Sequence, residues 1–317
     1  PSTPENIHLT LREPYGVVGR IIPFNHPIGF AASRIAPALI AGNTIVVKPS
    51  EQAPLSASLL AEICAEVAPP GVINIVTGDR VTGEVLVRDP RVKRIAFIGS
   101  VVSGMAIQRA AAESAVKHVS LELGGKNPFI VCEDANLDDA IKAATNGMNF
   151  GWQGQSCGST SRLIIHRSQY EELSKKVVER VKQVKVGHPL NTSIKMGPVV
   201  SEAQYQKVLD YIQIASDEGA ELLLGGNAME IDGCPGGFFV EPTVFGNVTS
   251  NMRIAQEEVF GPIMSLMPYD DLDDAIEIAN STTYGLTAAV WTNKYFTAME
   301  LSRSIEAGYV WVNGIGN

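Results

Sequence analysis

The sequence predicts an α/β fold made of two doubly wound α/β domains. The chain has 317 residues, about twice the length of a typical domain of roughly 150 residues. Hydrophobic residues make up 45% and charged residues 19%, as in ordinary globular proteins. Short β-branched runs alternate with longer helical stretches along the whole chain. Because the β-branched runs are apolar throughout, we expect strands covered on both faces, as in a parallel sheet wrapped by helices.

The first part of the chain contains five apolar runs with the length and composition of buried strands. Between them lie stretches with helical character, one of which has Pro54 well placed in its first turn. The expected strands are residues 17–22, 44–48, 72–76, 94–98 and 118–123, and the expected helices are residues 28–41, 54–68, 81–88 and 102–114.

A glycine-rich break at residues 124–128 separates this part from a second α/β domain. The alternation resumes after it, interrupted by a Gly/Pro-rich stretch at residues 187–198. The expected strands are residues 129–132, 163–166, 263–269, 286–291 and 309–312, and the expected helices are residues 135–149, 169–184, 202–218, 272–281 and 295–305.

Residues 7–12 differ from the buried runs because apolar and polar residues alternate there with a period of two. That pattern is typical of a strand with one solvated face. We expect an arm that lies outside the main sheet.

Charge, hydropathy and cysteine usage exclude several classes of function. The 25 Lys and Arg against 34 Asp and Glu give a net charge of −9, and without a long basic cluster we expect no nucleic-acid partner. No apolar run approaches the roughly 20 residues of a membrane helix, and no signal peptide precedes the first strand. Four widely spaced cysteines without a CxxC pair favour neither disulfides nor a metal site, and they indicate a reducing, cytoplasmic compartment.

Cys157 is the cysteine with the best context for chemistry. It follows a predicted helix in a stretch of Gly, Ser and Gln, where a substrate can approach a thiol, whereas Cys64 and Cys132 lie in apolar runs and suit the role of small buried hydrophobes. Residues 154–158 also match G-x-S-x-G, the spacing of a serine-hydrolase nucleophile elbow. That motif needs a strand before it and a helix after it, and here the predicted order is reversed.

Two further polar residues end predicted strands. Glu122 lies between leucines, so it is either a buried carboxylate with a raised pKa, suited to act as a base, or the partner of a nearby cation such as Lys126. Asn25 lies in a proline-bounded turn and is either an oxyanion donor or an ordinary turn residue.

Candidate nucleotide contacts follow two other strands. Lys48 and Glu51 come at the carboxyl end of a strand, where open α/β sheets bind ligands and where a Glu accepts hydrogen bonds from ribose hydroxyls; the alternative is a solvated loop. The chain has no G-x-G-x-x-G motif. Gly99 and Ser100 form a looser glycine turn before a helix, which suits the approach of a phosphate.

The order of these motifs resembles that of the aldehyde dehydrogenase superfamily over nearly the whole chain. The segments that carry the resemblance are residues 23–27 (PFNHP), 48–51 (KPSE), 97–100 (FIGS), 121–128 (LELGGKNP), 154–157 (GQSC) and 257–262 (EEVFGP). The resemblance implies an oligomerisation-arm strand at residues 1–13, an incomplete Rossmann-like NAD-binding domain at 14–124 and a catalytic domain at 125–317. It also implies a homodimer or homotetramer.

The resemblance implies that Cys157 is the nucleophile, whose thiolate attacks an aldehyde to give a thiohemiacetal. Asn25 and the backbone N–H of Cys157 would stabilise the oxyanion. After oxidation to a thioester, Glu122 would activate the water that releases the carboxylic acid. No metal is needed.

The resemblance also implies a nicotinamide cofactor. The implied cofactor-binding residues are Phe24, Lys48, Glu51, Gly99, Ser100, Glu258 and Phe260. Lys48 and Glu51 would hold the adenine-side ribose, and a Glu there repels a 2′-phosphate, which favours NAD over NADP. Glu258 would bind the nicotinamide-side ribose and Phe260 would support the ring. Phe24 replaces a usual Trp.

Family members have segments before residue 23 and after residue 317 that this chain lacks, so we expect it to be part of a longer enzyme. Two other functions stay open from the sequence. The chain could be a non-catalytic structural or binding protein of the same fold, or a cofactor-free thiol esterase that uses Cys157.

Overall fold

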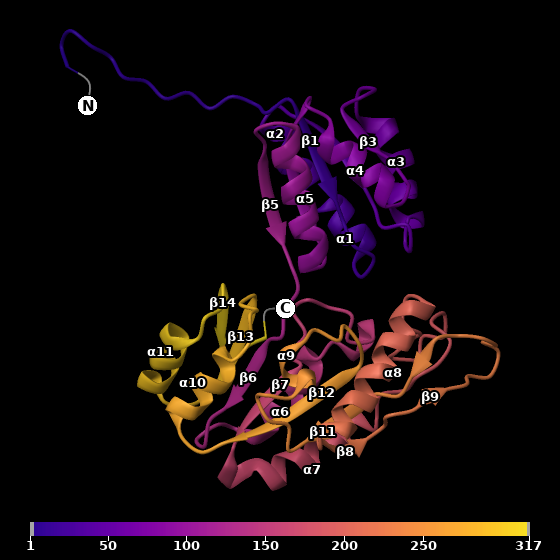
Figure 1. The fold of residues 1–317 in the computed structure, drawn as a ribbon, viewed down its shortest axis with the longest axis vertical. Helices are drawn as coiled ribbons and strands as arrows, with labels where there is room; N and C mark the ends of the chain where they lie inside the picture. The colour runs from indigo at the N-terminus through magenta and orange to yellow at the C-terminus, as the bar shows by residue number, and fades with distance from the viewer. Residues whose placement is uncertain (1–2, 316–317) are drawn as a thin grey trace. The chain divides into compact units, whose positions relative to one another are not determined.

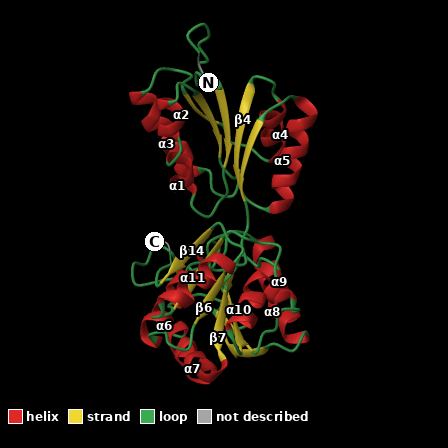
Figure 2. Cartoon of the chain, turned by 90° about the vertical axis from the view of Figure 1, so that its left-hand side faces the viewer, coloured by secondary structure: helices red, strands yellow, loops and turns green. Residues whose placement is uncertain are grey.

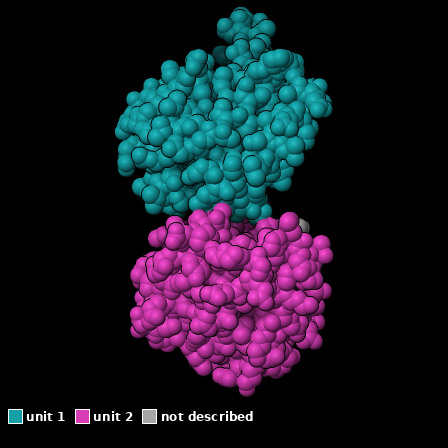
Figure 3. Space-filling model, turned by 90° about the vertical axis from the view of Figure 1, so that its right-hand side faces the viewer, with its two compact units in different colours: residues 1–123 teal, residues 124–317 magenta. Residues whose placement is uncertain are grey.

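The structure is a computed structural model that describes residues 3–315 and divides the chain into two compact units (Figure 1). Unit 1 comprises Pro1–Leu123 and unit 2 comprises Gly124–Asn317; Figure 3 colours them teal and magenta. Each unit is an α/β structure with its own sheet, which confirms the predicted fold class.

Unit 1 has a five-stranded sheet in the order β3-β2-β1-β4-β5, and all of its strand pairs are parallel. The strands are β1 Val17–Ile21, β2 Thr44–Lys48, β3 Ile73–Ile75, β4 Val92–Ile98 and β5 His118–Glu122. The chain moves outward from β1 to β3 and then crosses to β4 on the other side of β1. The carboxyl ends of β1 and β4 therefore flank the point where the strand order reverses, which is where such sheets bind ligands.

Helices cover both faces of this sheet (Figure 2). They are α1 Pro27–Ala32, α2 Ile35–Ile40, α3 Leu55–Val67, α4 Arg80–Arg88 and α5 Val101–Ser114. One small apolar cluster, which includes Ile45 and Val47, packs under α1 and α3. A second, which includes Val92 and Ile95, packs under α4 and α5.

The single helix expected over residues 28–41 is wrong, because two short helices occupy that stretch. α1 ends at Ala32 and α2 begins at Ile35. A proline ring inside a helix clashes with the carbonyl four residues earlier, so Pro37 is incompatible with a continuous helix through Ser33. Pro37 is tolerated in the first turn of α2, where its missing N–H has no helical partner to lose.

Unit 2 has a seven-stranded sheet in the order β14-β13-β6-β7-β12-β11-β8, parallel except for β8 against β11. Its strands, with a separate two-stranded ribbon β9–β10, are β6 Pro128–Val131, β7 Arg162–His166, β8 Glu221–Leu224, β9 Ala228–Met229, β10 Phe239–Val240, β11 Thr243–Gly246, β12 Ile263–Tyr269, β13 Thr287–Trp291 and β14 Tyr309–Val312.

Two large apolar clusters fill the two faces of the unit 2 sheet. Along β6 and β7, Phe129 and Leu163 point into the cluster under α6 and α7, and Ile130 and Ile164 point into the cluster under α8 to α11. The helices of unit 2 are α6 Leu137–Gly147, the 3₁₀ turns η1 Phe150–Trp152 and η2 Arg167–Gln169, α7 Tyr170–Val181, α8 Glu202–Asp217, α9 Arg253–Gln256, α10 Leu272–Asn280 and α11 Tyr295–Ser304. The buried alternation on both faces explains why these strands are apolar throughout.

The other predicted elements are present, with ends shifted by a few residues, but the sequence prediction missed the short elements β8 to β11 and α9. β9 and β10 pair over only two residues each, too short a run for any periodicity to be visible.

The strand expected at residues 7–12 does not form in the described part of the chain. Ile7, Leu9 and Leu11 are about four-fifths exposed, at 78%, 78% and 80%, and none of the sheets includes them. An extended segment becomes a strand only when another strand supplies its hydrogen bonds, and no strand in the described part of the chain pairs with residues 7–12.

Candidate functional site

Cys157 lies in a tight turn between η1 and β7, and its side chain is half-buried. The backbone enters the turn through left-handed residues, Asn149 with a φ of 59°, Gln153 with 55° and Gly154 with 66°. A Cβ atom at Gly154 would lie 2.0 Å from the carbonyl oxygen of Gly261, so only glycine fits there. This segment therefore cannot continue the preceding helix, and the turn packs directly against the 257–262 segment.

Hydrogen bonds from buried side chains hold the turn in place. The Asn127 Nδ2 donates to the carbonyl oxygens of Cys157 at 2.7 Å and Ser159 at 2.8 Å. The buried Gln155 accepts a hydrogen bond from the backbone N–H of Val200 at 3.1 Å. The 3₁₀ turn η1 precedes this segment and the strand β7 follows it, so residues 154–158, which match G-x-S-x-G, do not form a nucleophile elbow.

Glu258 lies in the loop between α9 and β12, close to the 124–128 loop. Its Oε1 accepts a hydrogen bond from the backbone N–H of Gly125 at 3.0 Å. Burial raises the pKa of the Glu258 carboxyl, because desolvation disfavours the charged form.

Two side chains of α8 hold the backbone of this loop. Gln204 Nε2 donates to the carbonyl oxygens of Val259 and Phe260, both at 2.9 Å, and Lys207 Nζ donates to that of Glu258 at 2.8 Å. Phe260 adopts a left-handed φ of 59°, which is rare for a bulky residue. The strained backbone at Phe260 is thus fixed from outside the loop.

Lys126 is almost completely buried, with 3% of its surface exposed. Burial and, to a lesser extent, the nearby cation of Arg162 lower the pKa of its ammonium to about 7, while Glu258 acts in the opposite direction. Arg162 is itself buried, and its Nε donates to the Lys126 carbonyl oxygen at 2.8 Å.

In unit 1, Lys48 and Glu51 line a cavity of about 400 Å³ formed between the end of β2 and the helices α4 and α5. The Lys48 side chain is buried, and its Nζ donates to the carbonyl oxygen of Pro49 at 2.9 Å and lies 3.5 Å from Glu51 Oε2. Glu51 itself is 59% exposed. A buried cation beside an accessible carboxylate can hold both hydroxyl and amine groups of a ligand.

Gly99 and Ser100 form the turn between β4 and α5. Ser100 is the N-cap of α5, and its Oγ accepts a hydrogen bond from the backbone N–H of Ser103 at 3.2 Å. A Cβ atom at Gly99 would lie 2.5 Å from the Phe97 ring. The Gly99 N–H donates to the Glu122 carbonyl oxygen at 3.0 Å, so the structure brings these two predicted residues side by side.

Of the two alternatives for Glu122, the buried carboxylate is wrong, because the residue is exposed. β5 is one of the two edge strands of the unit 1 sheet, and the residues at both of its ends are exposed. Asn25 follows β1 in an irregular turn next to Phe24, and its Oδ1 is buried without a hydrogen-bond partner among the described residues.

The predicted residues divide between the units. Cys157, Glu258 and Phe260 belong to unit 2 and share the contacts of the 124–128 loop and α8. The remaining predicted residues, Phe24, Asn25, Lys48, Glu51, Gly99, Ser100 and Glu122, belong to unit 1. Sequence reasoning missed the roles of Gln204 and Lys207, because a polar pair three residues apart on a helix looks like any solvated face.

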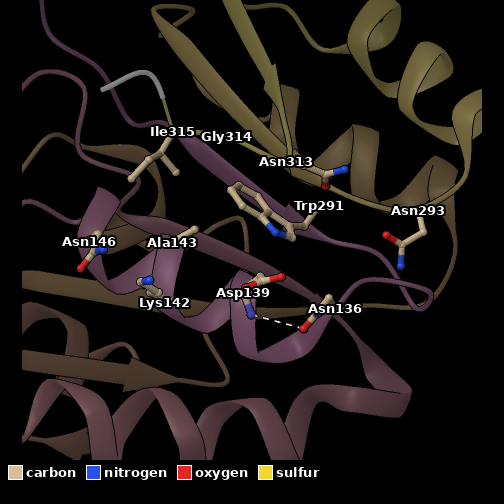
Figure 4. A pocket seen from close by; sticks show the side chains of 10 residues that line it. All are labelled: Asn136, Asp139, Lys142, Ala143, Asn146, Trp291, Asn293, Asn313, Gly314 and Ile315. Carbon is tan, nitrogen blue, oxygen red and sulfur yellow. Dashed lines mark hydrogen bonds between the residues drawn. The ribbon is translucent and has the colours of Figure 1, made fainter.

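A second cavity, of about 470 Å³, lies in unit 2 and was not predicted (Figure 4). One wall is the polar face of α6, with Lys142, Ala143 and Asn146, and the other includes Trp291 and Ile315. Asn136 caps α6 at the end of this cavity by accepting from the backbone N–H of Asp139 at 3.3 Å.

Within residues 3–315, no cluster of His, Cys, Asp and Glu side chains is suited to hold a metal ion. No helix in the same range has the length and apolar character needed to cross a bilayer.

Comparisons with known proteins place this architecture in a defined class. The family model described as "Aldehyde dehydrogenase family" matches residues 1–317. The chain is 45% identical over 317 residues to an aldehyde dehydrogenase, tropH, of Talaromyces stipitatus, covering 99% of this chain and 61% of that protein. It is 44% identical to retinaldehyde dehydrogenase 3 of Mus musculus, covering 99% of this chain and 60% of that protein.

Solved structures agree with this assignment. An NAD-dependent aldehyde dehydrogenase from Sinorhizobium meliloti superposes with a TM-score of 0.92 at 42% identity, covering 97% of this chain and 60% of that one. A betaine aldehyde dehydrogenase from Staphylococcus aureus in complex with NAD+ gives a TM-score of 0.92 at 36% identity, covering 96% of this chain and 61% of that one.

The two α/β units are those of a family of oxidoreductases. The chain belongs to the aldehyde dehydrogenase family. It spans about 60% of the length of the relatives it matches.

Proposed function

We propose that this chain belongs to an NAD-dependent aldehyde dehydrogenase that oxidises an aldehyde to a carboxylic acid, with Cys157 as its nucleophile. The observation that carries the proposal is the Cys157 turn, in which a half-buried thiol lies on a backbone fixed by Asn127 and Gly154. A thiol that only fills space in a core does not need such a turn.

The first step is attack by the Cys157 thiolate on the carbonyl carbon of the aldehyde. A carbon–sulfur bond forms, the π electrons of the carbonyl move to its oxygen, and the product is a thiohemiacetal. The side-chain amide of Asn25 and the backbone N–H of Cys157 donate hydrogen bonds to that oxygen. In this role the donor is the Nδ2 of Asn25, which the irregular turn after β1 carries.

The residues of the chain fit a nicotinamide dinucleotide. Lys48 and Glu51 line a cavity of about 400 Å³ and would hold the adenine-side ribose. Gly99 and Ser100 lie at the N-terminus of α5 and would contact the pyrophosphate. When bound, the nicotinamide supplies the acceptor for the two electrons that convert the thiohemiacetal to a thioester.

Three more residues complete the proposed cofactor site. Glu258 would bind the nicotinamide-side ribose, and its hydrogen bond from Gly125 fixes one oxygen of the carboxylate. Phe260 would support the ring with its fixed left-handed backbone, and Phe24 follows the central strand β1. The Glu51 carboxylate would repel a 2′-phosphate, which favours NAD over NADP.

Glu122 is proposed to remove a proton from the water that hydrolyses the Cys157 thioester. Its exposed side chain has access to water, which this role requires. We further propose that the complete protein is a homodimer or homotetramer in the cytoplasm. The wide spacing of the four cysteines, without a CxxC pair, supports that compartment.

The test is the formation of reduced nicotinamide, followed by absorbance, when the protein meets NAD and a panel of aliphatic and aromatic aldehydes. Cys157→Ala should abolish the signal, while Cys234→Ala, which removes another half-buried thiol of unit 2, should retain it. Full turnover by the Cys157→Ala variant would remove Cys157 as the nucleophile. If the folded wild-type chain forms no reduced nicotinamide, the activity requires the complete protein. The two cysteine variants are then compared in the complete protein.

Glu122→Gln tests the hydrolytic step. The variant should accumulate a thioester on Cys157, seen as an acyl mass on the peptide that contains it, because the amide cannot accept the proton of water at neutral pH. Normal turnover without an acyl adduct would show that another group activates the water.

A further inference from the structure

The loop that joins the two units, residues 124–127, contacts the Cys157 turn and Glu258 together. The backbone N–H of Gly125 donates to Glu258 Oε1 at 3.0 Å, and a Cβ atom at Gly125 would lie 2.5 Å from the Cys157 carbonyl oxygen. The loop can approach both groups only because position 125 carries no side chain.

Asn127 makes the most specific of these contacts. Its side chain is 2% exposed. One amide N–H donates to the Cys157 carbonyl oxygen at 2.7 Å and the other to that of Ser159 at 2.8 Å, while Oδ1 accepts from the backbone N–H of Thr287 at 3.2 Å. An amide has two N–H donors and one oxygen, so every polar group of Asn127 is used and the orientation of the amide is determined.

The loop that carries Asn127 is itself anchored to the core of unit 2. Arg162 Nε donates to the Lys126 carbonyl oxygen at 2.8 Å. The other guanidinium nitrogens of Arg162 donate to the carbonyl oxygens of Ile278 and Ala279, both at 2.7 Å, at the end of α10. Asn127 therefore holds the Cys157 turn in a fixed position relative to the core of unit 2.

We propose that Asn127 is a positioning residue for the Cys157 thiol. Its hydrogen bonds to the carbonyls of residues 157 and 159 fix the peptide plane that follows Cys157 and the one that follows Ser159. The first of these bonds sets ψ of Cys157 and with it the direction of the Cα–Cβ bond that aims the sulfur. This proposal rests on the proposed function in one respect, that Cys157 is the reacting group.

Asn127→Asp is the most informative variant, because it keeps the shape of the side chain and the acceptor for Thr287. It replaces both N–H donors with an oxygen that faces two carbonyl oxygens, which repels the turn. Asn127→Ala removes all three hydrogen bonds without that repulsion. The matched control is Asn43→Ala in unit 1, since Asn43 is also buried and makes three hydrogen bonds of the same kind, to Gly16, Ala38 and Ala41.

The measurement is the rate of alkylation of each cysteine by iodoacetamide between pH 6 and 10, followed by peptide mass spectrometry on the folded chain. A half-buried thiol can be approached from few directions, and misplacement of a reacting atom by about 1 Å can cost about 100-fold in rate. We expect both Asn127 variants to slow alkylation of Cys157 by about 10- to 100-fold. The rate at Cys234 in the same molecules, and at Cys157 in Asn43→Ala, should stay unchanged.

An unchanged Cys157 rate in the two Asn127 variants would overturn the proposal. An increase in the alkylation rates of all the cysteines, including the buried Cys64 and Cys132, would also overturn it, because it would show that Asn127 only stabilises the fold. This assay needs neither cofactor nor aldehyde. Failure of the proposed function would instead appear as full turnover by Cys157→Ala, so the two failures are distinguishable.

Discussion

The two units of the chain bury their sheets to different extents. In unit 2, every residue of β6 and β13 is buried, and large apolar clusters fill both faces of the sheet. In unit 1, β3 has no fully buried residue, the ends of β5 are exposed, and the two apolar clusters are small. Unit 2 therefore has the core of an independent domain, whereas unit 1 depends on fewer contacts.

The outer face of α3 is a second place where unit 1 leaves apolar residues exposed. Its apolar residues recur every four positions on one side of the helix and are largely exposed: Leu55 83%, Leu59 58%, Ile63 53% and Val67 81%. Such a stripe usually packs against a core. We infer that unit 1 is the less stable unit of this chain, and three predictions test that difference.

The largest expected effect is in the core of unit 2. Ile164→Ala removes a fully buried side chain from β7 and should cost about 2–5 kcal/mol of unfolding free energy, through lost burial and the cavity left behind. Ile73→Ala in the half-buried β3 of unit 1 is the matched control and should cost less. All three tryptophans, Trp152, Trp291 and Trp311, lie in unit 2, so urea unfolding followed by their fluorescence reports that unit.

Far-UV circular dichroism, which reports both units, should detect a transition at lower urea than the fluorescence does. If the circular dichroism and fluorescence transitions of the wild-type chain coincide, and Ile164→Ala and Ile73→Ala shift them equally, the two units unfold together. That result would contradict the inference that unit 1 is the less stable unit.

The next effect is smaller for each unit of pH and comes from Lys126. Its pKa is about 7 in the folded chain against an ordinary 10.5. Below pH 7 both states carry the proton and the full cost of burying the charge is present. Between pH 7 and 10.5 the unfolded state holds the proton and the folded state does not, so stability rises with pH by up to about 1.4 kcal/mol per unit.

Lys126→Met should therefore raise the urea midpoint of unit 2 most at pH 7 and progressively less at pH 8 and 9, as read by tryptophan fluorescence. Lys93→Met, which removes an exposed ammonium in unit 1, serves as the control. A gain that is constant over this pH range would show that Lys126 is not buried as a neutral amine.

The smallest effect is expected on α3. Leu59→Ser should change the unfolding free energy of unit 1 by less than about 0.5 kcal/mol, because the side chain is mostly exposed. Ala57→Ser places the same residue on the buried face of the same helix and should cost about 1–3 kcal/mol by burying a hydroxyl. Circular dichroism measures both, and a large loss from Leu59→Ser would mean that the stripe is covered.

Much of the fold could be predicted because each of its longer strands is visible in a short run of apolar, β-branched residues. Residues 44–48 are a strand in both prediction and structure. Where the prediction failed, local pattern was insufficient. β8 reads Glu-Leu-Leu-Leu, which suits a helix or a strand, and only its antiparallel partner β11 decides between them. The break before α2 required the steric effect of Pro37 to outweigh a continuous apolar pattern.

The candidate site, too, could be predicted only in part. The Gly/Ser/Gln context of Cys157 is visible in the sequence. The contacts that hold its backbone come from Asn127 and Gly261, which lie far away along the chain, and hydrogen bonds to backbone carbonyls leave no residue pattern. The exposure of Glu122 could not be predicted either, because it depends on where β5 ends and on its place in the sheet.

The Cys157 turn also has a consequence for the order of events during synthesis and refolding. Its left-handed residues cannot nucleate regular structure by themselves, and its fixed geometry depends on the Gly261 carbonyl, which leaves the ribosome long after the thiol. A nascent chain that ends before β12 therefore carries Cys157 without the partner that shapes its turn. The alkylation rate of the Cys157 thiol should reach the value of the folded chain only late in folding, so alkylation kinetics during refolding would time the completion of unit 2.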